Sequence, residues 1–380
     1  MLDLTSLFYA LVLGFGIFGL DAVWSSATVK TDFQVSAALG NAGVGSEFAT
    51  AVFARELEEV FATPSLVKAP SVRSSHEKTF VSVMADSMGL KNAAIAFQDL
   101  FGLHPVKILA TLTTESGQRR LELVGVASAR GTFYVSLEAE PGETTVALIR
   151  RGAVDAAIRI DPYHTALYLL DPPVGAPDVA RARRVLDDAL AAQEPTPINT
   201  MRGRFHNLRG IVALLDQDKA GAAAFFEEAI GDDSELVSAH LNLAFIRIEQ
   251  GRYADAAMIV GNVLRTQKQG LQPALLATAH TISGVIAWSQ KQFRTAEEHF
   301  GAAVAAVPLV SDANIYWGRM LVEIGRSEEG RRKIRQGEAN LVDFENYAEV
   351  AMLYFWLTEK DEGPLRLRPR AGSGVALKWR

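Results

Sequence analysis

The chain has 380 residues, of which 49% are hydrophobic and 22% charged, and its formal net charge is −6. This length permits two or three domains, each with its own core, and the composition excludes a generally disordered chain. The mild negative charge provides no clustered basic face, so we expect no nucleic-acid partner. Cysteine is absent, which excludes disulfides, thiolate zinc sites, iron–sulfur clusters and a cysteine nucleophile.

Residues 1–27 are predicted to be a transmembrane anchor or signal. The run from Leu4 to Leu20 carries no charged residue, and Trp24 suits the membrane interface. A cleaved signal peptide and a buried core helix are the alternatives, although no basic residue precedes the run. We expect a single-pass membrane protein whose soluble body is periplasmic.

Residues 28–45 read as a polar linker, and residues 46–170 as a small α+β domain. Ser46 is expected to cap the first helix, Ser46 to Phe61. Three alternating segments with glycines between them predict an antiparallel meander. The expected strands are 79–83, 106–113, 120–126 and 132–138, and the other expected helices are 91–101, 144–160 and 162–170.

Site chemistry is not evident in this domain. Glu138, Glu140 and Glu143 surround a Pro-Gly turn, where exposed carboxylates are expected, and the histidines are scattered without metal-ligand spacing. The run from Gly14 to Gly19 has the letters of the dinucleotide fingerprint G-x-G-x-x-G but lacks its strand-turn-helix context. We therefore expect no catalytic residues, no cofactor and no metal, and a protein that is not an enzyme.

The C-terminal half is predicted to be a helical solenoid. Residues 171–197 form a linker that contains a helix from Val179 to Ala192. Beyond it, small residues recur at Gly210, Ala244, Gly284 and Gly318, with spacings of 34, 40 and 34 residues. A period of about 34, with two antiparallel helices per repeat, is typical of the tetratricopeptide repeat (TPR). We expect four TPR repeats in 198–343, a capping helix in 344–360 and a flexible basic tail in 361–380.

The order of parts, with a helix ending at Asp161-Pro162-Tyr163 before the helical repeats, resembles a poorly characterised group of bacterial membrane-anchored TPR proteins. In these proteins a small α+β domain lies between the anchor and the repeats. The resemblance implies an envelope protein and transfers no catalytic residues. The expected fold is therefore multidomain: an N-terminal transmembrane helix, a small α+β domain and a C-terminal all-α TPR solenoid.

A partner-binding groove can be assigned by reading the family's groove positions onto the first helix of each repeat. The predicted groove residues are Asn207, Ile211, Leu214, Leu241, Phe245, Ile248, Thr281, Val285, Trp288, Ile315 and Arg319. They are mostly apolar, which suits an amphipathic helix or an extended peptide. The alternative is that the groove is filled from within, by the 179–192 helix or by the α+β domain.

Three histidines, His206, His240 and His280, occupy the same position in successive repeats, with Asn314 in the fourth. Adjacent helices lie about 10 Å apart, whereas zinc ligands lie within about 2.3 Å of one ion. We therefore expect these residues to pack, and not to bind metal.

The sequence predicts a membrane-tethered protein–protein interaction scaffold or adaptor that binds a protein or peptide in its TPR groove. One alternative is an enzyme or ligand-binding α+β module to which the repeats present a partner. The other is a homo-oligomeric structural protein of the envelope.

Overall fold

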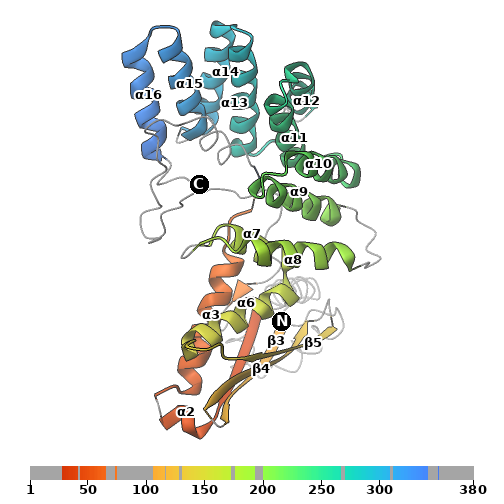
Figure 1. The fold of residues 1–380 in the computed structure, drawn as a ribbon, viewed down its shortest axis with the longest axis vertical. Coiled ribbons are helices and arrows are strands. Elements are labelled where there is room, and N and C mark those ends of the chain that lie inside the picture. The colour runs from red at the N-terminus through yellow and green to blue at the C-terminus, as the bar shows by residue number, and fades with distance from the viewer. Residues whose placement is uncertain are drawn as a thin grey trace, which may run out of the picture. The chain divides into compact units, whose positions relative to one another are not determined.

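The computed structural model describes residues 28–41, 43–65, 73–74, 106–115, 117–127, 131–172, 176–192, 200–266, 270–308, 311–340 and 350 (Figure 1). The chain forms two compact units. The first unit comprises residues 1–63 and 70–165, and the second comprises 64–69 and 166–380.

The first unit is built on a five-stranded sheet with the order β2-β1-β3-β4-β5. Its elements are β1 (Thr28–Val35), α2 (Ala37–Asn41), α3 (Ser46–Phe61), β2 (Arg73–Ser74), β3 (Val106–Glu115), β4 (Gln118–Ala127), β5 (Gly131–Glu138) and α6 (Thr145–Ile160). Strands β3, β4 and β5 pair antiparallel in sequence order, which confirms the predicted meander. Strand β1 is parallel to both of its neighbours, β2 and β3.

The prediction that residues 28–45 are only a linker is wrong, because β1 and α2 lie in this segment. Val29 and Phe33 are buried while Lys30 and Asp32 between them are exposed. This is the period-two alternation of a half-buried strand. The polar residues that resemble a linker in the sequence form the exposed face of the strand.

Helices α3 and α6 pack against each other and cover one face of the sheet. The Phe33 ring of β1 meets the Phe53 ring of α3 edge to face, with centroids 5.4 Å apart. On α6, a Cβ at Gly152 would overlap the Leu121 side chain of β4, so the helix lies close to the sheet because this position has no side chain.

Two helix caps explain where these helices begin. The Thr144 hydroxyl accepts the Ala147 N–H at the start of α6, a standard N-cap bond. The expectation that Ser46 caps α3 is wrong, because Gly45 is the N-cap residue and makes no side-chain bond. Asp161 precedes α7 (Pro162–Leu170), and its Oδ1 accepts the His164 N–H, as predicted for an Asp-Pro helix start.

The second unit is helical. Its elements after α7 are α8 (Val179–Ala191), α9 (Thr200–Leu215), α10 (Lys219–Asp232), α11 (Val237–Glu249), α12 (Tyr253–Thr266), α13 (Pro273–Ser289), α14 (Phe293–Ala306), α15 (Ser311–Glu323) and α16 (Ser327–Asn340). From α9 onward the described helices pack in consecutive pairs, α9 with α10, α11 with α12, α13 with α14 and α15 with α16 (Figure 1). One hydrophobic cluster runs from α9 to α15.

Small residues lie where the two helices of a pair cross, as predicted. A Cβ at Gly284 would approach the Phe300 ring to 2.6 Å, and one at Gly210 would overlap the Phe226 ring. In the last pair a Cβ at Gly318 would lie 2.6 Å from the Gly330 carbonyl oxygen. Phe226 and Phe300 are fully buried, so glycine lets an aromatic ring of the second helix fill the crossing.

Several predictions fall outside the described residues: the anchor or signal (1–27), the 79–83 strand, the 91–101 helix, the capping helix (344–360) apart from Val350, and the tail (361–380). Among the helices that the structure describes, none combines the length and hydropathy needed to cross a bilayer.

Candidate partner-binding surface

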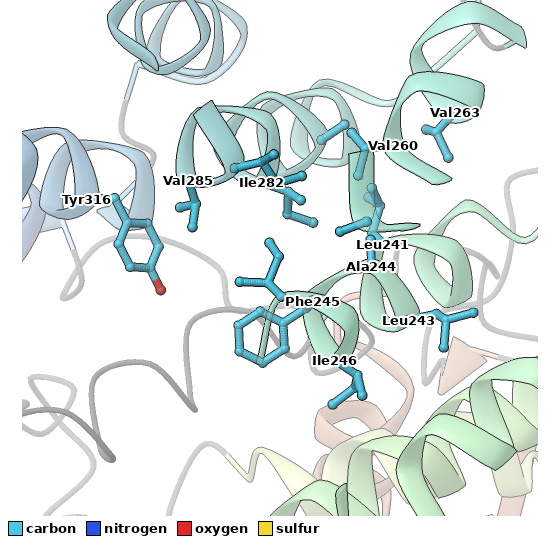
Figure 2. Packing of buried hydrophobic residues seen from close by; sticks show 14 of the residues in the cluster. Leu241, Leu243, Ala244, Phe245, Ile246, Val260, Val263, Ile282, Val285 and Tyr316 are labelled. Atoms are coloured by element: carbon cyan, nitrogen blue, oxygen red, sulfur yellow. The ribbon is translucent and has the colours of Figure 1, made fainter. Parts of the chain in front are cut away.

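The first helices of successive pairs lie side by side. Helix α13 packs against α11 on one side and α15 on the other, and Figure 2 shows Phe245, Val285 and Tyr316, one from each of these three helices, in the shared core. Helix α9 joins the same row, because the Asn242 amide of α11 donates to Asn207 Oδ1 at 2.9 Å. Both asparagines are buried, and their hydrogen bond fixes the register of α9 and α11.

The structure places most of the predicted groove residues inside this row of helices. Asn207, Ile211, Leu214, Leu241, Phe245, Ile248, Thr281, Val285 and Ile315 are buried, while Trp288 and Arg319 are half-buried. Apolar positions on a helix that touches neighbours on both sides face those neighbours, so their side chains hold the solenoid together. The role of the set as partner contacts stays a prediction.

The two half-buried members mark a surface on the last turns of α13 and α15. Trp288 Nε1 donates to Glu323 Oε2 at 2.8 Å, and Val322 is an exposed large apolar residue. Arg319 lies one turn before Val322 and Glu323 on the same helix face. We name Trp288, Arg319, Val322 and Glu323 the α13–α15 edge.

Val322 and Glu323 were missed by the sequence reading. The repeat spacing contains the signal for Val322, because it stands 34 residues after Trp288, as Ile248 stands 34 after Leu214. Leu214 and Ile248 are buried, whereas Trp288 is half-buried and Val322 exposed. We call Leu214, Ile248, Trp288 and Val322 the apolar row. Its members are buried in the first two helix pairs and accessible in the last two.

A second aromatic position, Trp317, is surrounded by charged side chains from α14 and α16. Its Nε1 donates to Glu297 Oε1 at 3.2 Å, and the Lys333 ammonium lies 3.9 Å from its ring centroid. Arg326 Nη1 also donates to Glu297 Oε1, at 2.7 Å. Burial lowers the pKa of Lys333. These contacts tie the fourth pair to the third and leave the indole engaged within the protein.

Each histidine of the repeated position has its own local partner. His206 Nδ1 lies 2.7 Å from Asp232 Oδ2, and His240 Nε2 lies 2.9 Å from the Ser234 carbonyl oxygen. His280 Nδ1 lies 3.2 Å from His299 Nδ1 on the paired helix. Within the described part of the chain, no three His, Asp or Glu residues are grouped to hold a metal ion.

In the first unit the carboxylates of the Pro-Gly turn serve the fold. Glu143 Oε2 accepts from Arg151 Nη2 at 2.8 Å and from the Glu140 N–H at 2.9 Å. These hydrogen bonds, that of Arg151 first, lower the pKa of Glu143. Asp161 and His164 form a fully buried pair, with His164 Nδ1 3.1 Å from Asp161 Oδ2.

Comparison with known proteins finds a family match in the helical region. Residues 174–237 match the model described as "Tetratricopeptide repeat". The matched range includes α8, α9 and α10, so it begins before the predicted first repeat at residue 198. No curated protein matches the chain.

Three similar solved structures are a crystal structure of MamA, PilF of Pseudomonas aeruginosa and the MamA RS-1 ArsTM double mutant. The MamA structure is 14% identical, with 43% of this chain and 88% of that chain covered and a TM-score of 0.33. PilF is 17% identical over 50% of this chain and 82% of that chain, with a TM-score of 0.38. The double mutant is 14% identical, with 47% of this chain and 94% of that chain covered and a TM-score of 0.34. The family match and the four described helix pairs together support a tetratricopeptide repeat protein.

Proposed function

We propose that the helical array is a protein–protein interaction scaffold or adaptor and that its α13–α15 edge contacts the partner. The observation that carries this proposal is the change along the apolar row, from buried Leu214 and Ile248 to half-buried Trp288 and exposed Val322. A tryptophan and an arginine beside an accessible aliphatic side chain are the residue types that dominate protein interfaces.

The α13–α15 edge favours a partner segment with both apolar and charged groups. Val322 and the Trp288 ring offer apolar area, while Arg319 and Glu323 offer charges of opposite sign one turn apart. An amphipathic helix or an extended peptide with alternating side chains presents such groups on one face. Charged pairs at the rim would set the register and contribute less to affinity than the apolar contacts.

Site-specific photo-crosslinking in cells tests this proposal. A benzophenone amino acid is placed at Val322, and the matched control carries it at Met258 on α12, a second helix; these residues are 40% and 63% exposed. We expect a discrete adduct from position 322 and none from position 258. Arg319→Glu should abolish the adduct from position 322, whereas Arg294→Glu, at an exposed site on α14, should leave it unchanged. Equal labelling from both positions, or no adduct from 322, would reject the surface.

The same experiment separates the proposal from a homo-oligomeric structural role. An adduct with the mass of two copies of this chain would favour self-association through the α13–α15 edge. An adduct with a different protein supports the scaffold. Mass spectrometry of the adduct distinguishes the two results.

We also propose that the body is tethered to the membrane by residues 1–27 and lies in the periplasm. Support comes from the sequence, in the uncharged run from Leu4 to Leu20 and in Trp24 after it. Fractionation with protease treatment of intact cells, permeabilised cells and lysed spheroplasts tests it. Cleavage that first appears after outer-membrane permeabilisation is expected, and cleavage only after spheroplast lysis would place the body in the cytoplasm.

For the first unit we propose a role other than catalysis. The Asp161–His164 pair is fully buried, so it presents no atom to a substrate, and the Glu143 carboxylate is engaged by Arg151. A nucleophile with a base and an orienting group is what catalysis would require. Activity-based probes for hydrolases that label the purified protein would argue for the enzymatic alternative.

A further inference from the structure

The sheet of the first unit has one covered and one exposed apolar face. Val106, Ile108, Ala110 and Leu112 of β3 and Leu121 and Leu123 of β4 are buried on the face that α3 and α6 cover. On the opposite face Leu109, Val124, Val126 and Tyr134 are 44%, 42%, 51% and 58% exposed. Leu109 pairs directly with Val124, and Val124 with Tyr134, so these three side chains form one row across three strands.

Such a row is unusual on a solvated sheet face, which normally carries polar residues. The neighbouring positions on the same face follow that rule near the β3–β4 turn, where Arg120 and Glu138 form an ion pair at 2.6 Å. The apolar residues gather at the other end of these strands, beside the start of β3. We name Leu109, Val124, Val126 and Tyr134 the exposed sheet patch.

The strand order constrains the path that the chain takes from β2 to β3. From β1 the chain passes through α3 to β2, and from β2 it must cross back over β1 to reach β3 on the other side. All three strands are parallel, so both connections are crossovers, and crossovers are right-handed in about 98% of cases. Two right-handed crossovers that run in opposite lateral directions lie on opposite faces of the sheet.

Since α3 covers the first face, a right-handed second crossover through residues 75–105 would run over the face with the exposed sheet patch. Its length of about thirty residues exceeds the dozen or so that a parallel crossover needs, and such crossovers usually contain a helix. The sequence from Lys91 to Phe101 predicts that helix, with Ala94, Phe97, Leu100 and Phe101 on one side. A helix of that length spans about 16 Å, at 1.5 Å per residue, and three strands span about 10 Å at 4.8 Å spacing.

We propose that residues 91–101 dock as an amphipathic helix on the exposed sheet patch. The apolar side of this helix meets Leu109, Val124, Val126 and Tyr134, and the unit becomes a three-layer domain with helices on both faces. The patch is then an internal docking surface for this chain, and the α13–α15 edge is the surface left for an external partner. The inference concerns the first unit and stands independently of the proposed function.

Paired cysteines test the docking on a clean background, because the natural chain has none. Phe97→Cys is combined in turn with Cys at 109, 124, 126 and 134, and each pair is treated with a short bis-maleimide. We expect an intramolecular link from Phe97→Cys to at least one of these positions. The matched control combines Phe97→Cys with Arg55→Cys, an exposed position on α3, and should give no link.

Other occupants would give other products, and each would overturn the proposal. Links between two copies through Val124→Cys would identify a second chain as the occupant, and links from Val124→Cys to Leu11→Cys would identify the N-terminal run. Failure of all four positions to link to Phe97→Cys, with unhindered labelling of Val124→Cys by maleimide, would show an uncovered patch.

A second measurement avoids dependence on crosslinking chemistry. Phe97→Ala, Val124→Ala and the double variant are compared by thermal unfolding. If the two side chains touch, the shift of the unfolding midpoint in the double variant should be smaller than the sum of the two single shifts. Additive shifts in the double variant would contradict docking of Phe97 on the sheet.

Discussion

The Nδ1 atoms of His280 and His299 lie 3.2 Å apart, and their rings are tilted by 34° with centroids 5.5 Å apart. At this distance one imidazole donates to the other, which requires that at least one ring is neutral. Burial lowers the pKa of both histidines. Repulsion from a protonated His299 lowers the pKa of His280 further, whereas the Glu298 carboxylate raises the pKa of His299 and so opposes the effect of burial there. Burial between α13 and α14 therefore favours the uncharged form of both rings.

The first prediction follows from the sign of these shifts. A histidine whose pKa is lower in the folded state binds fewer protons when folded than when unfolded, in the window below the ordinary value of 6.5. Stability of the array should be fully present above pH 6.5 and fall as the pH decreases through that window. Thermal unfolding from pH 8 to pH 5 measures the loss. His280→Gln with His299→Gln should flatten this part of the profile, and an unchanged slope would refute the assignment.

For Asp312 we predict the opposite pH dependence, a stability that falls as the pH rises. Its carboxyl is buried, and burial raises its pKa to about 6 although the Ala313 N–H donates to it. Because the folded protein binds this proton more tightly than the unfolded chain, protonated Asp312 stabilises the array. This contribution is fully present below pH 3.8 and is lost as the pH rises through about 6. Asp312→Asn should therefore stabilise the array at pH 7.5 by roughly 1–3 kcal/mol, at 1.36 kcal/mol per pKa unit.

The control for Asp312 is the same variant at pH 4, where the parent carboxyl is largely protonated and the gain should nearly vanish. Denaturant unfolding at both pH values provides the comparison. A gain of equal size at pH 4 and pH 7.5 would show that ionisation of Asp312 is not its cause.

Helix crossing at Gly284 predicts a packing cost. Gly284→Ala adds a Cβ 2.6 Å from the buried Phe300 ring, and such overpacking costs about 1–3 kcal/mol. Gly301→Ala on α14 is the matched control, because a Cβ there meets nothing within 4 Å. It should stabilise by about 0.5–1 kcal/mol through helix propensity. Equal effects of the two variants in urea unfolding would contradict the crossing geometry.

Phe245 and Val322 separate stability from binding. Phe245→Ala removes a buried ring from the core shared by α11 and α13 and should lower the free energy of unfolding by about 3–5 kcal/mol. Val322→Ala alters an exposed residue, so it should change stability by less than about 0.5 kcal/mol yet weaken partner crosslinking from a benzophenone at position 288. If Phe245→Ala kept the parent's free energy of unfolding but abolished partner crosslinking, Phe245 would be a partner contact and not a core residue.

The helical array could be predicted well from the sequence because its helix pairs are held by contacts between residues that are close in the chain. Glycine at 210, 284 and 318 marks a backbone approach that only a small residue permits, and each is found against an aromatic ring or another glycine. Such contacts join helices adjacent in the chain. The meander was equally readable, because its turns at Gly117 and Gly131 have positive φ, which favours glycine.

Strand β1 and the exposure of the groove residues could not be predicted in the same way. The polar residues of β1 become intelligible only once β3 lies beside it, since Phe33 then faces α3 and Asp32 faces away. Likewise Phe245 and Val322 are both apolar residues on first helices, and only the packing of α13 against α11 decides that the first is buried. Tertiary neighbours, not local pattern, determine these outcomes.

The position of β1 also has a kinetic consequence. Val29 pairs with Val106 and Val35 with Leu112, so the ladder between β1 and β3 joins residues that are 77 positions apart in the sequence. In the helical array, Gly210 meets Phe226 within one hairpin. Because folding slows as the sequence separation of native contacts grows, the helix pairs of the array should form before β1 pairs with β3. During that interval the edge of β3 that pairs with β1 remains open to pairing with other chains, which makes this strand more exposed to aggregation during folding than the described helix pairs.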